Sequence, residues 1–418
     1  MNIVSRDIFP ALAASLADNR IVVITGQRRV GKTTAVRWLL AQAPETNKLF
    51  LDLERLDQRA VFQESNYDLI LAFLRNRGLD LTQPSYVALD EIQNAPNVPS
   101  VVKYLYDLAD AGEIAPIKFI LTGSSSFYLK NLFTESLAGR KVVFEMFPLT
   151  FGEFLRFRQV HYRPRASFKD MLFDPYEYER LKGHYEEYIA YGGLPQVVLA
   201  GTPQAKTEIL NDILSSFINT DVRMLADFQK TAELQQLMRV LAMRIGNKID
   251  HTKLASIVGV SRPTLVQYLE FLEMTYVIRR LPALSDSPDR VAALARKLYF
   301  CDNGIAGVLA RIGEGALFEN AVFNQLRPYG SLSYLGRGSE YEIDFVLTAN
   351  LAAGDSGPEA PQFDGSGARA FEVKTHPLSA DLQKALRIAA TNNIRETYLI
   401  ARFPTPGFSD FIWAGLIF

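Results

Sequence analysis

Apolar runs bounded by polar turns recur along the first 150 residues of the chain. The runs cover residues 21–24, 48–53, 86–89, 118–122 and 141–147, and helical patterns separate them. Strands that alternate with helices imply right-handed crossovers and a parallel sheet that is covered on both faces. The pattern therefore predicts an α/β domain over residues 1–150, with a five-stranded parallel sheet as its core.

The pattern changes after this region and predicts three further units. Residues 151–229 are helical in pattern and rich in Tyr and Phe, with a break at Tyr191-Gly-Gly-Leu-Pro195, and we interpret them as a helical lid. Residues 230–289 contain a short helix, a turn at Gly259, an N-cap at Ser261 and a second helix, which is the helix-turn-helix layout. Residues 290–418 mix strands and helices. Their insertion at 350–369 is rich in Gly, Pro and small polar residues and predicts a mobile loop between two strands.

Composition indicates a soluble, globular chain. Its 418 residues are 48% apolar and 22% charged, which suffices for two to four domains with their own cores. Residues 1–20 alternate charged and apolar positions, so they predict an amphipathic helix beside the sheet rather than a signal peptide. No stretch approaches the length of a membrane span. The single cysteine, Cys301, excludes an internal disulfide, and the four histidines are too far apart for a zinc site, so we expect a cytoplasmic protein.

A phosphate-binding loop follows the first apolar run directly. Its spacing is Gly26-Gln-Arg-Arg-Val-Gly31-Lys32-Thr33. Glycines let the backbone turn its N–H groups inward around phosphate oxygens, and the helix that follows points its positive end at the anion. Lys32 would bind the β and γ phosphates of ATP, and Thr33 would offer its hydroxyl to Mg²⁺. The predicted nucleotide-binding residues are Gly26, Gln27, Arg28, Arg29, Val30, Gly31, Lys32, Thr33 and Thr34.

A second part of the same site is expected where the third apolar run ends in Asp90 and Glu91. Asp90 would hold Mg²⁺, and Glu91 would orient and polarise the attacking water. The fourth run leads into hydroxyl side chains, and Thr122 or Ser124 would sense the γ-phosphate. Arg140 would act as an arginine finger toward a neighbouring subunit, with a surface ion pair as the alternative.

Taken together, these motifs resemble the prokaryotic AAA-type ATPases that carry a C-terminal domain of unknown function. The resemblance rests on GQRRVGKTT, LDEIQ, LTGSSS, LAGRKVVFEMFPLTFGEF, YGGLP, RKLYFCDNG, EIDFVL and FEVK. It implies a P-loop NTPase domain of the AAA type with a helical lid, then a winged-helix domain and a restriction-endonuclease-like α/β domain. The chain departs from the family's usual Asp-Thr-Gly-like turn at Cys301-Asp-Asn-Gly, and its insertion from Asn350 is long.

The C-terminal strands also carry a candidate nuclease centre. Asp344 lies on one predicted strand, and Glu372 and Lys374 share one face of the next because side chains alternate along a strand. In nucleases of the PD-(D/E)xK type, such carboxylates hold Mg²⁺ while the lysine assists the attacking water. Glu319, on a preceding helical segment, is a further candidate ligand. The alternative is a structural cluster of ion pairs without catalysis.

Contact with DNA would require a local patch, because the formal net charge of −1 gives no overall attraction to nucleic acid. The second helix of the helix-turn-helix offers Arg262 and Gln267, and Arg279 and Arg280 follow it. Glu270 and Glu273 on the same helix would weaken the attraction. The alternative is a rigid contact with the lid or with another subunit.

The sequence thus predicts a cytoplasmic, Mg²⁺-dependent ATPase of the AAA type that acts on DNA. We expect a homo-oligomer that binds ATP between its subunits, with no membrane association and with a nuclease-like domain whose cleavage activity is open. Two alternatives stand beside it: an ATP-dependent regulatory switch, and a protein-remodelling scaffold that binds no nucleic acid.

Overall fold

The computed structural model divides into two compact units, one ending at Phe147 and the other beginning at Pro148. It describes residues 3–418 except 45, 64–65, 125–138, 223–230, 286, 288, 290, 292–293, 338–339 and 349–366. No helix in these described ranges is both long enough and apolar enough to cross a membrane.

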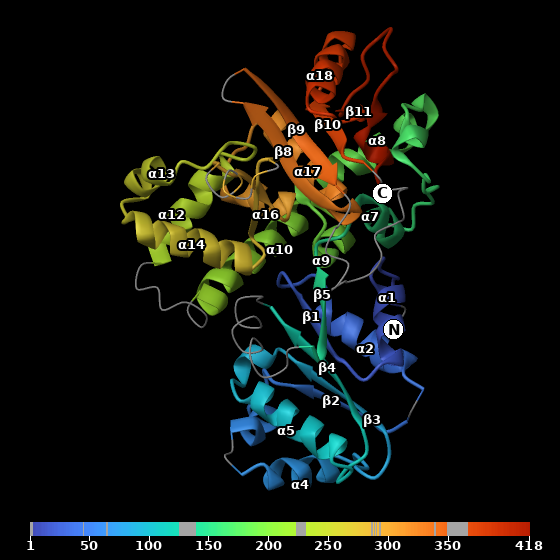
Figure 1. Ribbon diagram of the computed structural model, residues 1–418, viewed down its shortest axis with the longest axis vertical. Coiled ribbons are helices and arrows are strands. Elements are labelled where there is room, and N and C mark those ends of the chain that lie inside the picture. Colours follow the sequence, from blue (N-terminus) through green and yellow to red (C-terminus); the bar gives the residue numbers. More distant parts are fainter. Residues whose placement is uncertain are drawn as a thin grey trace. The chain divides into compact units, whose positions relative to one another are not determined.

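The first unit is built on a five-stranded parallel sheet, which confirms the sequence prediction. Its strands are β1 (Ile21–Gly26), β2 (Lys48–Asp52), β3 (Ser85–Asp90), β4 (Ile117–Gly123) and β5 (Lys141–Met146). Their spatial order is β2-β3-β4-β1-β5, and every pairing is parallel (Figure 1). Because β4 lies between β1 and β3, its carboxyl end separates the phosphate loop from the acid pair.

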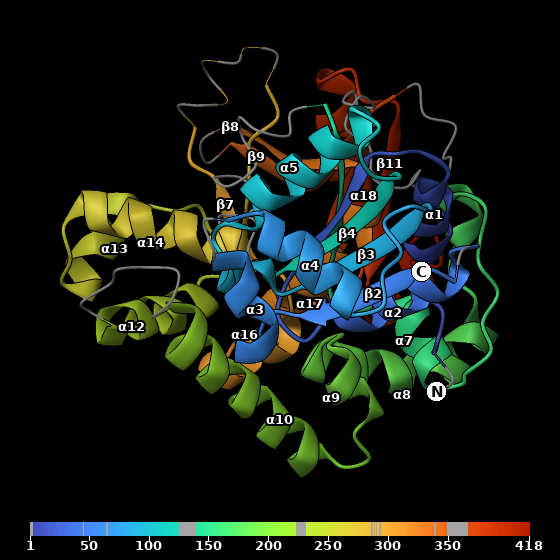
Figure 2. The same cartoon turned by 90° about the horizontal axis from the view of Figure 1, so that it is seen from below.

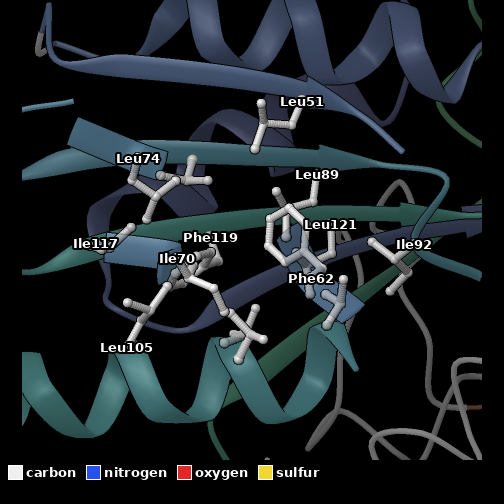
Figure 3. Close-up of a cluster of buried hydrophobic side chains, with 14 of the residues drawn as sticks. Leu51, Phe62, Ile70, Leu74, Leu89, Ile92, Leu105, Ile117, Phe119 and Leu121 are labelled. Atoms are coloured by element: carbon white, nitrogen blue, oxygen red, sulfur yellow. The ribbon is translucent and has the colours of Figure 1, made fainter. Parts of the chain in front are cut away.

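Helices cover both faces of this sheet. They are α1 (Phe9–Ala14), α2 (Lys32–Gln42), α3 (Leu56–Arg59), α4 (Asp68–Asn76) and α5 (Val98–Asp110), with short 3₁₀ turns at Ser15–Ala17, Ala60–Gln63 and Ile92–Asn94. Figure 3 shows strand residues such as Phe119 and Leu121 gathered with Leu105 of α5 and with Ile70 and Leu74 of α4. Each such buried side chain contributes roughly 1.5–3 kcal/mol relative to an exposed one. The alternate strand residues face the side where α2 contacts β1, β3 and β4.

The N-terminal segment packs beside this sheet, as the sequence predicts. The ring of Phe9 stacks on that of Trp38 in α2, with centroids 4.1 Å apart. On β4, the buried Lys118 Nζ donates hydrogen bonds to the carbonyls of Ser15 and Asp18, each at 2.6 Å. The segment is therefore held by both apolar and polar contacts.

The second unit begins with helices, as expected for residues 151–229. They are α7 (Phe151–Phe157), α8 (Pro175–Tyr191), α9 (Pro195–Leu199) and α10 (Pro203–Ser216), with a 3₁₀ turn at Phe168–Met171 and a π-helical turn at Phe217–Val222. The break between α8 and α9 has a specific cause. Gly193 N donates to Asp302 Oδ2 at 2.8 Å, and a Cβ on Gly192 would lie 2.3 Å from that oxygen. Gly192 is thus required by the close approach of Asp302, and Gly193 by the carbonyl oxygen of Leu149, 2.4 Å from where its Cβ would lie.

A helix-turn-helix and an antiparallel strand pair follow. The helices are α12 (Thr231–Ala242), α13 (His251–Val258) and α14 (Arg262–Met274), and the strands are β6 (Ile278–Leu281) and β7 (Lys297–Phe300). Figure 2 shows α13 and α14 side by side. Gly259 ends α13 with φ 75°, and the Ser261 side chain caps α14 by accepting from Thr264 N. Both turn residues act as the sequence predicts.

The chain ends in a second five-stranded sheet, of mixed direction. Its elements are α16 (Asn303–Leu309), α17 (Glu314–Leu326), β8 (Ser331–Arg337), β9 (Tyr341–Thr348), β10 (Arg369–Lys374), α18 (Ser379–Thr391), β11 (Glu396–Ala401) and β12 (Ile412–Trp413), with 3₁₀ turns at Arg327–Tyr329 and Ala414–Leu416. The order is β12-β11-β10-β9-β8, antiparallel from β8 to β10 and parallel from β10 to β12. Figure 1 shows α18 beside β10 and β11. The predicted loop joins β9 to β10, and most of it lies outside the described residues.

Candidate functional site

The phosphate loop connects the buried strand β1 to the start of α2. Gly26 has φ 147°, and a Cβ there would lie 2.0 Å from the carbonyl oxygen of Met146 in β5. Gly31 has φ 98° and is the N-cap of α2, in a backbone region that L side chains rarely adopt. Both predicted glycines are therefore required, one by the close approach of β5 and one by its backbone angle.

The Lys32 side chain contacts the phosphate loop that precedes it. Its side chain is buried, and Nζ donates to the carbonyls of Gly26 at 3.1 Å and Gln27 at 3.0 Å. The ammonium thus lies at the positive end of α2, where an anion is favoured. This position fits the role predicted for Lys32 toward phosphate.

Asp90 joins the two halves of the site. Thr33 Oγ1 donates to Asp90 Oδ2 at 2.7 Å, and Thr122 Oγ1 donates to Asp90 Oδ1. Burial raises the pKa of the Asp90 carboxyl, and the two hydroxyl donors oppose part of that rise. A hydroxyl and a carboxylate are hard oxygen ligands, and Mg²⁺ is usually held by one or two such groups together with substrate phosphates. The donor set therefore fits Mg²⁺ bound with a nucleotide.

Glu91 is fixed by bonds to both its backbone and its side chain. It has φ 56°, in the left-handed region. Its N–H donates to Thr122 Oγ1 at 2.9 Å, and its carbonyl accepts from Asn94 Nδ2 at 3.0 Å. Its carboxylate accepts from Gln93 Nε2, which also donates to Ser124 Oγ at 3.1 Å. A left-handed non-glycine residue costs about 1–3 kcal/mol and persists where its surroundings over-determine it, often at functional sites.

Two further residues support the site and were missed by sequence reasoning. Arg6 is buried, and its guanidinium donates to the carbonyls of Val30 at 2.9 Å and Phe147 at 2.8 Å, joining the phosphate loop to the end of β5. No motif marks it. Glu54 follows β2, and burial together with the nearby Glu91 carboxylate raises its pKa, while Arg28 lowers it. Its place after a neighbouring parallel strand is a signal that could have found it.

The structure does not bring Arg140 to this site. Its guanidinium pairs with Asp107 of α5 at 3.0 Å and lies over the ring of Tyr106. This is the surface ion pair that the sequence offered as the alternative to an arginine finger. A role toward a neighbouring subunit stays a prediction.

The candidate nuclease residues gather on the second sheet. Glu319 comes from α17, Asp344 from β9, and Glu372 and Lys374 from β10. Val373 N donates to Asp344 Oδ2 at 2.9 Å, and Lys374 Nζ pairs with Glu372 Oε1 at 2.5 Å. Burial and the Asp344 carboxylate raise the pKa values of both Glu319 and Glu372.

Sequence reasoning missed a lysine at this centre. Lys297 of β7 is buried, and its Nζ lies 2.7 Å from Glu342 Oε1, 3.5 Å from Asp344 Oδ1 and 3.9 Å from Glu319 Oε1. Burial alone would lower the pKa of Lys297, but the carboxylates of Asp344 and Glu319 raise it. In the part of the chain that the structure describes, no three His, Cys, Asp or Glu side chains are arranged to hold a metal ion. Lys297 thus places a positive charge of the chain beside Asp344, and the Mg²⁺ centre expected from the sequence stays a prediction.

The predicted DNA-contacting residues differ in their surroundings. Arg262 and Gln267 are exposed on α14. The guanidinium of Arg279, on β6, lies over the ring of Tyr276. Arg280, also on β6, pairs with Glu273 of α14, and its Nε lies 2.7 Å from Glu273 Oε2. The charge of Arg280 is thus already balanced within the unit.

Comparisons with known proteins agree with an AAA-type domain in the first unit. Residues 18–155 match the family model described as an AAA domain, and residues 182–315 match a domain of unknown function, DUF8612. An uncharacterised protein of Methanocaldococcus jannaschii is 28% identical over 359 residues, 82% of this chain and 75% of that protein. One from Haemophilus influenzae is 27% identical, over 78% of this chain and 79% of its own.

Two solved structures are distantly similar to this chain. The Aeropyrum pernix ORC1 protein in complex with DNA has 14% identity and a TM-score of 0.31, covering 75% of this chain and 91% of its own. The Thermotoga maritima RuvB Holliday junction branch migration motor has 19% identity and a TM-score of 0.29, covering 67% and 89%. The strand order, the phosphate loop and the match over residues 18–155 make the first unit similar to an AAA domain.

Proposed function

We propose that this protein is a Mg²⁺-dependent ATPase. The observation that carries the proposal is the hydrogen bond from Thr33, on the phosphate loop, to Asp90, at the end of β3. It brings a phosphate-binding loop and a carboxylate pair into one site, although 57 residues separate them in sequence. Mg²⁺, when bound there, would neutralise charge on the phosphates.

Each residue of the site has a separate role in the proposed hydrolysis of ATP. Lys32 binds the β and γ phosphates through its ammonium, and the loop residues 26–34 supply backbone N–H donors. Thr33 and Asp90 would hold Mg²⁺. Glu91 orients the attacking water and accepts its proton, and Thr122 or Ser124 contacts the γ-phosphate. Most of the rate gain in phosphoryl transfer comes from such positioning and electrostatics.

ATP binding and turnover by purified protein test this function. Lys32→Ala should abolish nucleotide binding in calorimetry. Glu91→Gln should still bind ATP but lose activity by roughly 10²–10⁴-fold, since proton transfer by a positioned side chain contributes about that much. Lys103→Ala, which removes an exposed lysine of α5, is the control and should behave as wild type. Wild type that binds no ATP, or Glu91→Gln that turns over ATP at the wild-type rate, would contradict the proposal.

We also propose that the ATPase acts on DNA as a cytoplasmic homo-oligomer, with ATP bound between subunits. The proposal is supported by the helix-turn-helix order of α13 and α14, the strand pair after it, and the exposed Arg262 and Gln267 on α14. These features fit a winged-helix domain. A regulatory switch or a protein-remodelling scaffold remains the alternative, and the response of ATP turnover to DNA separates them.

For the second sheet we propose a nuclease-like domain without cleavage activity. The order of α17, β8, β9, β10 and α18 and the grouping of Glu319, Asp344, Glu372 and Lys374 support the likeness. Lys297 favours the inactive alternative, because an ammonium at 3.5 Å from Asp344 competes with any divalent cation for the same carboxylates. The predicted divisions at 150, 229 and 289 remain proposals, and the DUF8612 match crosses the last two.

A further inference from the structure

Gln93 connects the carboxyl ends of two neighbouring strands, β3 and β4, at the proposed ATP site. It lies in the 3₁₀ turn Ile92–Asn94, directly after β3 and the acid pair. Its Nε2 donates to Glu91 Oε2 and, at 3.1 Å, to Ser124 Oγ at the end of β4. A side-chain amide nitrogen carries two N–H donors. Both donors of Gln93 are therefore used on residues of the site.

Electrostatics fixes the orientation of this amide. With the amide turned over, its oxygen would face the Glu91 carboxylate, and two acceptors would repel each other. Among the described residues no donor bonds to Gln93 Oε1, so no partner of the oxygen favours the reverse orientation. The nitrogen therefore faces the Glu91 carboxylate.

The other bonds to Glu91 reach only its backbone. Thr122 Oγ1 accepts from the Glu91 N–H, and Asn94 Nδ2 donates to the Glu91 carbonyl. Gln93 is thus the residue, among those described, whose hydrogen bond holds the Glu91 carboxylate itself. A donor on Oε2 leaves Oε1 as an acceptor for a water molecule.

We propose that Gln93 is a positioning residue that holds the Glu91 carboxylate for attack on the γ-phosphate and ties it to Ser124. The proposal rests on the ATPase function proposed above. Ser124 directly follows β4, the strand between β1 and β3. Because Gln93 Nε2 donates to both Ser124 Oγ and the Glu91 carboxylate, a movement of the Ser124 hydroxyl would also move that carboxylate. The orientation of the water-activating carboxylate then depends on what Ser124 contacts.

The first test separates positioning from binding. Gln93→Met keeps the length of the side chain but removes both donors. We expect kcat for ATP hydrolysis to fall roughly 10–100-fold, because small misplacements of a reacting group cost about that much. The Kd of ATP and the melting temperature should stay at wild-type values. Gln83→Met, at an exposed glutamine before β3, is the matched control and should retain wild-type kcat.

The second test uses Gln93→Glu, which keeps the length of the side chain but replaces the amide by a like charge beside Glu91. We expect kcat to fall further than in Gln93→Met, because the two carboxylates repel each other. The Kd of ATP should again stay at the wild-type value.

The outcomes separate this proposal from the function on which it rests. Wild type that does not hydrolyse ATP overturns both. A protein that hydrolyses ATP as wild type, loses activity in Glu91→Gln, and keeps its kcat in Gln93→Met overturns only the role of Gln93. A Gln93→Met protein with weaker ATP binding and unchanged kcat also overturns it, because that result assigns Gln93 to binding.

Discussion

At the scale of single residues, Asp90 shows a conflict between stability and function. Its carboxyl is 3% exposed, and burial raises its pKa. An ionised group in this place costs folding free energy, although the hydroxyls of Thr33 and Thr122 recover part of the cost. A buried carboxylate that is retained despite this cost is expected where a cation binds.

Asp90→Asn should therefore stabilise the nucleotide-free protein at neutral pH. Because the folded-state pKa is raised, the folded form binds the proton more tightly than the unfolded chain does. The ionised carboxyl thus lowers stability above that pKa, and the penalty fades as pH falls toward the ordinary value of 3.8. Melting temperatures of wild type and Asp90→Asn should differ more at pH 7 than near pH 4, with the variant higher at pH 7. The variant should also lose Mg²⁺-dependent ATP turnover.

Asp212→Asn, at an exposed carboxylate of α10, provides the comparison and should not raise the melting temperature at pH 7. A wild type that is more stable than Asp90→Asn at pH 7 would show that the hydroxyl bonds outweigh burial.

The residues that the structure groups around the phosphate loop could be predicted where the signal is local in sequence. Lys32 and Thr33 follow from the spacing of one loop, and Asp90 from its position at a strand end. Arg6 was missed because it donates to Val30 and Phe147, 24 and 141 residues away, and no spacing rule links them. Lys297 was missed for the same reason, since its carboxylate partners come from two later elements, α17 and β9.

At the scale of elements, the strands of the first sheet were predictable and their order was not. Parallel strands buried on both faces appear as continuous apolar runs, and β1 and β4 are buried at every position. Nothing in those runs says that β4 lies between β1 and β3. Likewise, nothing in the sequence indicates that the Gly-Gly turn and the Cys-Asp-Asn-Gly turn contact each other. The two turns meet at Asp302, whose carboxylate accepts hydrogen bonds from the N–H groups of Gly193 and Ile305. Burial raises the pKa of Asp302 to about 6, although these hydrogen bonds lower it.

The hairpin strand β7 contributes Lys297 to the second sheet's carboxylates, and this contact can be tested. Lys297→Met leaves buried carboxylates without their ammonium and should destabilise the protein by about 3–5 kcal/mol. Mn²⁺ or Mg²⁺ should then raise the melting temperature of the variant but not of wild type. Denaturant unfolding with and without the metal measures both effects.

Lys248→Met is the matched control. Lys248 pairs with Glu342 at 2.7 Å but is 36% exposed, so its loss should cost no more than about 1 kcal/mol and create no metal response. Wild type should leave supercoiled DNA intact with either metal. Mg²⁺-dependent nicking by wild type that Glu372→Ala and Lys374→Ala abolish would instead establish a working nuclease centre.

At the scale of the whole molecule, charge limits how the protein can engage DNA. The formal net charge is −1, so attraction must arise from a few cations rather than from the overall field. Glu273 already neutralises Arg280, and Glu270 is exposed on the same helix α14 as Arg262. Few phosphate contacts imply a shallow dependence of binding on salt, since each contact contributes about 0.9 to the slope of log K against log salt.

Arg262→Ala should accordingly weaken duplex DNA binding roughly 10-fold at low salt and reduce the salt slope by about 1. Arg280→Ala removes a cation from the same region that is held 2.5 Å from Glu273, so it should change DNA affinity much less. Fluorescence anisotropy across a salt series, beside ATP turnover with single-stranded, duplex and branched DNA, measures affinity and coupling together. Equal affinities of the two variants would remove α14 from the DNA contact. Binding unaffected by high salt, with turnover indifferent to every DNA form, would instead favour a protein partner and the regulatory switch.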